Sequence, residues 1–205
     1  MTQKPTACLA LADGTIFYGM GFGATGETVA ELCFNTAMTG YQEIMTDPSY
    51  AGQVVTFTFP HIGNTGVTPE DDETDNPVAE GMVVKWDPTQ SSNWRATEEL
   101  TTWLARRNRI GMGGIDTRRL TRAIRQQGAP HVALAHNPDG NFDIAAGSDQ
   151  SAVGIVLYLG DGAGGWTPLD GPTTTGRFGD IILADLNNDG RLDLAGSNLF
   201  EGINV

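Results

Sequence analysis

The sequence predicts an α/β layered domain followed by an all-β, propeller-like repeat fragment. Up to about residue 138, strand-like and helix-like patterns alternate with short loops. The composition then changes: residues 1–138 hold 10 Lys and Arg against 15 Asp and Glu, whereas residues 139–205 hold 2 against 10, with 13 of the 27 glycines. A motif of this second part also recurs about 50 residues later. We therefore expect domains at 1–138 and 148–205, with a junction at 139–147 that fits both patterns.

The strands of the first part are predicted from apolar runs rich in β-branched and aromatic residues. The runs ACLALA at 7–12 and TIFYG at 15–19 flank Asp13-Gly14, a dipeptide that tolerates the positive φ of a tight turn, and together they predict a hairpin. Further strands are expected at 28–36, 54–59, 81–86 and 132–136.

Two helices are predicted from their caps and from the spacing of their apolar residues. Thr97 can cap the segment EELTTWLARRN, and Asp116 can cap TRRLTRAIRQQ, with Gly128 at the C′ position. The residues expected to face inward are Leu100, Trp103 and Leu104 in the first helix and Leu120 and Ile124 in the second.

The stretch GFGATG at 21–26 matches the dinucleotide fingerprint G-x-G-x-x-G. That fingerprint binds a pyrophosphate only when its last glycine opens a helix. Here the alternating run ETVAELCFN follows, which is typical of a strand. The glycines are therefore interpreted as turn residues.

Two charged features have competing interpretations. The acidic segment PEDDETDNP at 69–77 lacks the spacing of a metal site and has prolines at both ends, so a solvated loop is favoured. Arg118, Arg122 and Arg125 share the face of their helix opposite its apolar residues. This face is either simply solvated or suited to an acidic partner surface.

The overall charge and the cysteines restrict the class of protein. A net charge of −13 disfavours a nucleic-acid or anionic-membrane partner. No run approaches the ~18 apolar residues of a membrane span, and no secretory signal is recognised. Cys8 and Cys33 lie in strand-like runs and are expected to be reduced and buried, as in a cytoplasmic protein.

Two long stretches carry a family resemblance. FNTAMTGYQEIMTDPSYAGQVVTFTFPHIGNTG at 34–66 and SNWRATEELTTWLARRNRIGMGGIDTRRLTRAIRQQGA at 92–129 resemble the N-terminal domain of the small chain of glutamine-hydrolysing carbamoyl-phosphate synthase, over residues 9–143. The resemblance implies a swivelling β/β/α fold. In that family the small chain hydrolyses glutamine, and the large chain uses the ammonia with ATP and bicarbonate to make carbamoyl phosphate for arginine and pyrimidine synthesis. Docking on the large chain is therefore expected.

The resemblance carries over few site residues. The family's Cys nucleophile and His base belong to a separate glutaminase domain, so we assign no catalytic residue and expect no activity from this chain alone. Cys8 and Cys33 lie outside any G-x-C-x-G elbow, and His61 in FPHIGN receives no catalytic role. The resemblance implies one glutamine contact, Ser49 in TDPSY. One hydroxyl contributes only about 1 kcal/mol, so an exposed turn residue is favoured here.

The second part contains a candidate calcium loop. DGNFDIAAGS at 139–148 is echoed by DGRLDLAGS at 189–197, and short strands between Gly-rich turns suggest propeller blades. Within DLNNDGRLD at 185–193 the expected Ca²⁺ ligands are side-chain oxygens of Asp185, Asn187, Asp189 and Asp193 and the backbone carbonyl of Arg191. An EF-hand is excluded because its twelfth position is Gly196 and its flanks are strands. A metal-free Asp/Asn/Gly turn is the alternative.

This part resembles the FG-GAP or VCBS repeat of calcium-binding β-propellers, which occurs mainly in secreted and surface proteins. In the earlier copy Asn137, Asp139 and Asp143 match, but Ala135 replaces the first acid. A single blade needs neighbours to bury its sheet, so an isolated fragment is expected to be marginally stable.

Three interpretations of function follow. The first is a synthase small-chain fragment that docks on the large chain. The second is a calcium-binding surface or adhesion module. The third is a non-functional chimeric gene product, with its seam between Asp139 and Gly147, because joining a biosynthetic subunit to a partial propeller has no evident physical purpose.

Overall fold

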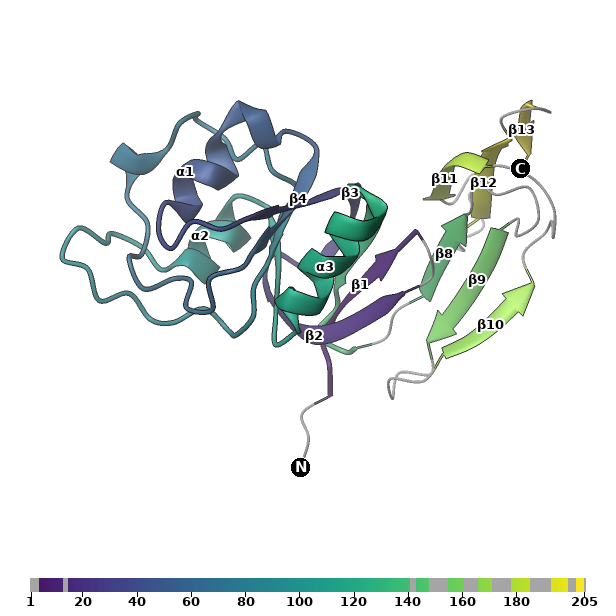
Figure 1. The fold of residues 1–205 in the computed structure, drawn as a ribbon, viewed down its shortest axis with the longest axis horizontal. Helices are drawn as coiled ribbons and strands as arrows, with labels where there is room; N and C mark the ends of the chain where they lie inside the picture. The colour runs from purple at the N-terminus through teal and green to yellow at the C-terminus, as the bar shows by residue number, and fades with distance from the viewer. Residues whose placement is uncertain are drawn as a thin grey trace. The chain divides into compact units, whose positions relative to one another are not determined.

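Seven strands of the first unit close into a barrel in the order β1-β2-β6-β5-β4-β3-β7 (Figure 1). The computed structural model describes residues 4–12 and 15–140 together with strand segments beyond them. The barrel strands are β1 (Ala7–Leu11), β2 (Ile16–Gly23), β3 (Gly26–Asn35), β4 (Gln53–Phe57), β5 (Gly81–Val83), β6 (Ile110–Gly113) and β7 (His131–His136). The chain divides into two compact units, residues 1–11 with 16–140 and residues 12–15 with 141–205.

Four neighbouring strands of the barrel run parallel. β3 pairs with β4, β4 with β5 and β5 with β6 in parallel, whereas β1, β2 and β7 complete the barrel with antiparallel pairs. Parallel neighbours need crossover connections, and helices lie in two of them. These are α1 (Tyr41–Thr46) between β3 and β4 and α2 (Leu100–Arg106) between β5 and β6. The carboxyl ends of all four parallel strands consequently share one rim.

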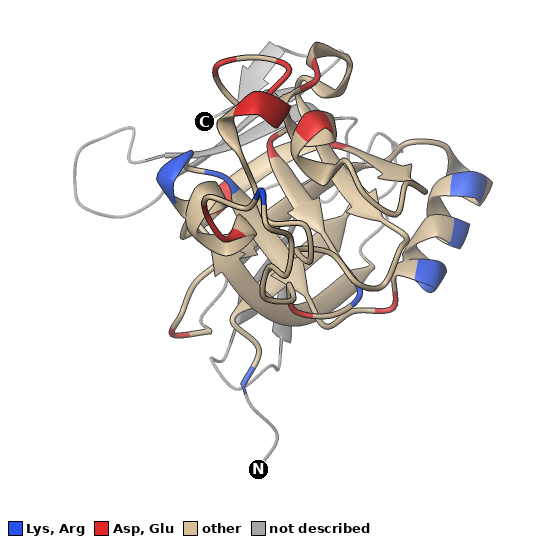
Figure 2. Ribbon diagram, turned by 90° about the vertical axis from the view of Figure 1, so that its left-hand side faces the viewer, with Lys and Arg blue, Asp and Glu red and all other residues tan. Residues whose placement is uncertain are grey.

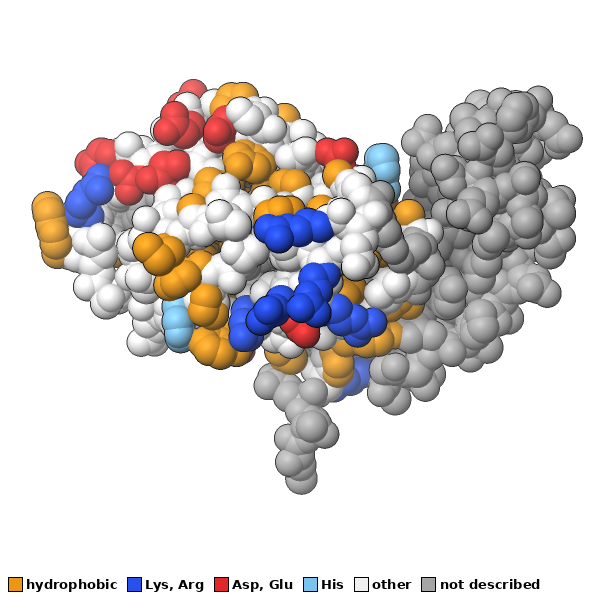
Figure 3. Space-filling view, in the orientation of Figure 1, with side chains coloured by type: hydrophobic (Ala, Val, Ile, Leu, Met, Phe, Trp, Pro, Cys, Tyr) orange, Lys and Arg blue, Asp and Glu red, His pale blue; other side chains and the backbone are white. Residues whose placement is uncertain are grey.

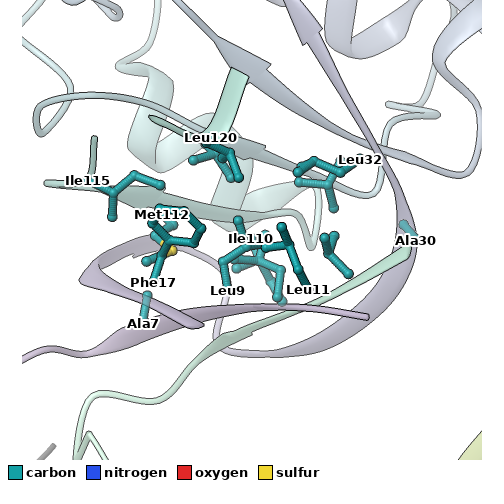
Figure 4. Close-up of a cluster of buried hydrophobic side chains, with 14 of the residues drawn as sticks. Ala7, Leu9, Leu11, Phe17, Ala30, Leu32, Ile110, Met112, Ile115 and Leu120 are labelled. Atoms are coloured by element: carbon teal, nitrogen blue, oxygen red, sulfur yellow. The ribbon is translucent and has the colours of Figure 1, made fainter. Parts of the chain in front are cut away.

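Two clusters of buried side chains hold this unit together. The first contains the barrel interior and the inner face of α3 (Thr117–Gln127); Figure 4 shows Leu9, Leu32, Met112 and Leu120 among its members. The second lies outside the barrel, where α1 and α2 pack on β4 and β5 and where Trp103 is buried. Because β4 and β5 are buried on both faces, their residues are mostly apolar, as in parallel sheets generally, with Gln53 and Thr56 of β4 as the exceptions.

Most of the predicted elements are present, with shifted ends. The six predicted strands correspond to β1 to β5 and β7, and β1 pairs with β2 as the hairpin prediction requires. Asp116 caps α3, its Oδ1 accepting from the amides of Arg118 and Arg119 at 3.1 and 3.0 Å, and Gly128 ends it with φ 88°. All five apolar residues predicted to face inward are buried.

Several predictions need correction. The predicted mixture of strands and helices is present, but the α/β layered arrangement is not evident: seven strands close into a barrel, because β7 pairs with both β1 and β3. Helix α2 begins at Leu100, and Thr97 is not its cap: the Thr97 hydroxyl donates to the carbonyl of Val67 at 3.0 Å, within the bridge that joins Val67 to Glu98. The swivelling β/β/α type stays a prediction.

The glycines of GFGATG are mostly strand residues and not turn residues. Gly21 and Gly23 lie in β2 and Gly26 begins β3, so only residues 24–25 connect the strands. Gly21 is needed for packing, since a Cβ there would lie 2.0 Å from the ring of His136. His136 is buried, and its Nδ1 lies 2.8 Å from the carbonyl oxygen of Ala24.

The second unit contains two three-stranded antiparallel sheets. One has the order β10-β9-β8 and the other β11-β12-β13. Their strands are β8 (Asp143–Gly147), β9 (Ile155–Gly160), β10 (Trp166–Asp170), β11 (Phe178–Ala184), β12 (Asp193–Asn198) and β13 (Gly202–Asn204). The predicted short strands are therefore present, whereas the propeller arrangement and the proposed domain limits stay predictions. Among the helices described, none combines the length and apolar character that crossing a membrane requires.

Candidate functional site

A pocket of about 550 Å³ lies at the rim formed by the carboxyl ends of the four parallel strands. Loops that directly follow β3, β4, β5 and β6 contribute its walls, together with residues 117–125 of α3. The lining residues are Thr36, Thr58, Pro60, Lys85, Asp116, Thr117, Arg118, Thr121, Arg122 and Arg125. We call this site the rim pocket.

The rim pocket is strongly basic although the whole chain is acidic. Lys85 and the three arginines of α3 that line the pocket have exposed side chains, and Figure 3 shows the Lys and Arg side chains gathered on this face. Figure 2 shows how the basic residues recur along α3. None of these four cations forms an ion pair with a carboxylate in the part of the chain that the structure describes. Their positive charge is therefore available to a ligand.

Aromatic contacts hold two of these cations in place. The guanidinium of Arg125 lies 5.2 Å from the ring centroid of Phe34, and Nζ of Lys85 lies 5.1 Å from that of Trp86. Such cation–π contacts orient a side chain without neutralising its charge. The helix pattern had indicated the arginine face, but Lys85 was missed because it joins the pocket only through strand order.

A partly exposed aromatic cluster lies next in sequence to two residues of the rim pocket, Pro60 and Lys85. It consists of Phe59, His61 and Trp86, with ring centroids 6.3 Å apart for Phe59 and His61 and 4.7 Å apart for His61 and Trp86. The side chain of His61 is exposed, and Trp86 is 47% exposed. Large aromatic side chains grouped at a surface are typical of protein interfaces.

Ser49 lies on the exposed 3-10 turn Pro48–Tyr50 and does not line the rim pocket. Its backbone amide donates to Oδ1 of Asp47 at 2.8 Å. Hydrogen bonds from the Ser49 amide and hydroxyl lower the pKa of Asp47 below its ordinary value. Ser49 thus stabilises its own turn, and the glutamine contact stays a prediction.

The acidic segment 69–77 begins with a 3-10 turn, Pro69–Asp71, and continues as a loop, and arginines hold part of it. The guanidinium of Arg107 binds Asp72 at 2.9 Å, and Arg95 binds Asp71 at 2.8 Å. Gln42 also donates to Asp72 at 2.7 Å. These partners occupy the carboxylates, and among the residues described no group of three or more acidic, His or Cys side chains is arranged to hold a metal ion.

Neither cysteine has the properties of an activated nucleophile. Both are free; Cys8 is buried and Cys33 is half-buried. Burial raises the pKa of the Cys8 thiol to about 12, and burial with the charge of Glu31 raises that of Cys33 to about 11. A reactive thiol needs a lowered pKa.

Most of the predicted calcium loop lies outside the described residues. The predicted ligands that fall there are Asp185, Asn187, Asp189 and Arg191. Asp193 begins β12, where its backbone pairs with Ala184. The ligand set therefore stays a prediction.

The earlier copy of the loop forms a turn up to Gly140. The Asn137 side chain accepts from the Asp139 amide at 3.0 Å, and the Asn137 carbonyl accepts from the Gly140 amide at 2.8 Å. Asp143 begins β8. These hydrogen bonds form a turn of the kind that needs no metal.

Comparison with known proteins finds a family match for each part. The family described as carbamoyl-phosphate synthase small chain, CPSase domain, matches residues 9–134, and the FG-GAP-like repeat matches residues 136–196. The carbamoyl phosphate synthase small chain of Ruegeria pomeroyi is 85% identical over 144 residues, which cover 70% of this chain and 37% of that protein. Those of Mesorhizobium japonicum and Agrobacterium fabrum are 59% and 58% identical over 147 and 149 residues, covering 70% and 71% of this chain.

The chain spans 37% of the length of these three relatives. A solved aminopeptidase from Aneurinibacillus sp. strain AM-1 aligns with a TM-score of 0.37 at 12% identity, over 72% of this chain and 36% of that one, a likeness too weak to support an argument. Since the small-chain match extends over more than half of its residues, the chain belongs to the carbamoyl-phosphate synthase small chain family through its CPSase domain.

Proposed function

We propose that the barrel unit is a docking domain that binds the large chain of carbamoyl-phosphate synthase in the cytoplasm. The observation that carries this proposal is the 85% identity over 144 residues to the small chain of Ruegeria pomeroyi. At such identity the surface residues that meet a partner are largely shared, in addition to the core. The domain would contribute to carbamoyl phosphate synthesis, and hence to arginine and pyrimidine synthesis, through assembly and not through chemistry of its own.

The aromatic cluster is the surface best suited to this docking. Interfaces concentrate their binding energy in a few aromatic and arginine side chains, surrounded by residues that exclude water. Trp86 is the largest member, and the cation of Lys85 lies over its ring. The cluster therefore combines apolar area with a fixed positive charge beside it.

Replacing Trp86 with alanine is expected to weaken binding to the large chain by about 30-fold, since truncating a central interface tryptophan costs about 2 kcal/mol. Titration calorimetry with the purified large chain measures the effect. Trp94→Ala is the matched control, because Trp94 is 91% exposed and lies outside the cluster. Equal losses in both variants, or none in Trp86→Ala, would place the docking surface elsewhere.

The same complex tests the absence of glutaminase chemistry. Because both thiols have raised pKa values, we expect glutamine-dependent synthesis to be absent. Ammonia-dependent synthesis by the large chain should be unaffected. Release of glutamate from glutamine by this chain contradicts the proposal. Ser49 would supply one hydrogen bond to glutamine only where the remainder of a glutamine pocket surrounds it, so glutamine titrated into the chain alone should give no binding heat.

Calcium binding by the loop at 185–193 is a second candidate function, favoured by the FG-GAP-like match over residues 136–196. Its oxygen-rich sequence suits a hard cation. Millimolar Ca²⁺ is expected to raise the melting temperature of the second unit by several degrees, because a ligand stabilises the state that binds it. Asp189→Ala should abolish the rise, while Asp161→Ala, outside the loop, should preserve it. A rise that survives Asp189→Ala contradicts this ligand set.

We also propose that the two parts come from unrelated genes joined between Asp139 and Gly147. The support is that the small-chain match ends at residue 134 and the FG-GAP-like match begins at residue 136, a few residues before this seam, and that no shared role is evident for the two parts. A single long DNA read through these codons tests the join. An unbroken read into the repeat shows a real fusion, and a read that leaves the repeat at the seam shows an assembly error.

A further inference from the structure

We propose that the rim pocket binds a small molecule that carries phosphoryl groups. This inference goes beyond docking on the large chain and does not depend on it. It rests on the position of the pocket in the sheet, on its charge and on the donors that line it.

The position is one where folds with parallel strands commonly bind ligands. Thr36 follows β3 directly, Thr58 follows β4, Lys85 lies two residues beyond β5 and Asp116 three residues beyond β6. Successive parallel strands bring the loops at their carboxyl ends together, so side chains distant in sequence converge on one space. In barrels with parallel strands the same rim carries the ligand site.

The charge of the pocket selects an anion with more than one negative charge. Lys85, Arg118, Arg122 and Arg125 face a single carboxylate, that of Asp116. The Asp116 carboxylate already accepts from two amides at the start of α3. One carboxylate on a ligand would leave most of this positive charge unbalanced, whereas a phosphoryl group carries about −1.5 to −2 at neutral pH.

The binding groups must be side chains. The first amides of α3 are occupied: those of residues 118 and 119 by the Asp116 side chain, that of Thr117 by the carbonyl of Ile115 and that of Leu120 by the carbonyl of Asp116. Arginine guanidinium groups match phosphate oxygens with paired, charge-assisted hydrogen bonds. The dipole of the helix start adds to this attraction without a direct contact.

Threonine hydroxyls supply further donors. Within the described part of the chain, the hydroxyls of Thr36 and Thr58 form no hydrogen bond. Thr121 already donates to the carbonyl of Thr117 at 2.7 Å, so its hydroxyl can only accept from a ligand. Two free donors beside four cations suit the several acceptor oxygens of a phosphoryl group.

The concave shape favours a small molecule over an acidic protein segment. The volume of about 550 Å³ falls within the range of small-molecule sites, which is about 300–1,000 Å³. A peptide would need an extended groove or stripe, whereas here residues from four loops and a helix line one space. The ligand class is therefore a compact phosphorylated metabolite.

The test is a calorimetric titration of the complete chain with inorganic pyrophosphate, and with inorganic phosphate, at low ionic strength. We expect saturable binding of pyrophosphate, tighter than that of phosphate and weakened by added KCl through screening. The double variant Arg118→Gln, Arg122→Gln should bind pyrophosphate at least about tenfold more weakly, because each removes a charge-assisted bond. Arg106→Gln is the control, since Arg106 pairs with Glu98 away from the pocket.

Absence of saturable binding at millimolar pyrophosphate overturns the proposal, as does unchanged binding by a double variant that melts at the temperature of the parent chain. If a Glu-rich peptide binds through the same arginines more tightly than pyrophosphate, the pocket is a protein-docking surface and the proposal is wrong. A double variant that loses pyrophosphate binding but still binds the large chain separates this inference from the docking function.

Discussion

Replacing Gly19 with alanine is expected to lower the free energy of unfolding of the barrel by at least about 3 kcal/mol. Gly19 lies in β2, where a Cβ would stand 2.1 Å from the backbone oxygen of Gly113 in the neighbouring strand β6. The side chains of Ile115 and Met112 would lie only 3.0 Å away. A backbone oxygen within a closed barrel cannot move aside without breaking the pairing of β2 with β6. The clash therefore cannot be relieved by a local rearrangement.

Urea unfolding followed by circular dichroism measures this loss. Gly128→Ala is the matched control, because Gly128 also lies at a special position, with φ 88°, but a Cβ there would meet nothing within 4 Å. Its cost is limited to the dihedral strain, about 1–3 kcal/mol. If the two variants lose the same stability, close packing between β2 and β6 is not what excludes a side chain from position 19.

Cys8 is expected to react with iodoacetamide about a thousandfold more slowly than an exposed thiol at pH 8. Only the thiolate reacts, and a pKa of about 12 instead of 9.0 reduces its fraction by three powers of ten. The rate is measured by mass spectrometry on the Cys33→Ser variant, in which Cys8 is the single thiol. Unfolding in urea should restore the ordinary rate, and a native rate that levels off near pH 9 contradicts the burial of this thiol.

The same shift has a consequence for stability at alkaline pH. The unfolded chain releases the Cys8 proton near pH 9.0, whereas the folded chain keeps it to about pH 12. Between these values the unfolded state binds fewer protons, so the free energy of unfolding falls as the pH rises, by about 1.4 kcal/mol per pH unit. Cys8→Ala should remove this part of the alkaline loss. An identical pH profile in the variant shows that Cys8 does not contribute to it.

Local sequence signals predicted the elements whose stability is itself local. Asp116, Gly128 and the inward spacing of Leu120 identified α3, because caps and a helical period act within a few residues. The same signals did not predict β6. Its sequence IGMG has only four residues, and two of them are glycines, which are uncommon in strands. They also misplaced the start of α2, because Thr97 is drawn into a bridge with a distant segment.

By itself, the sequence determined the helix faces, the apolar strands and the family of the first part, because each depends on neighbouring residues or on a long ordered match. Only the tertiary structure decided that the sheet closes and that a basic pocket exists. Closure depends on β7 pairing with both β1 and β3, and the pocket depends on the parallel order of β3 to β6, which brings Thr36, Lys85 and Arg122 to one rim. Strand order is set by contacts between residues far apart in the chain, and no local pattern encodes it.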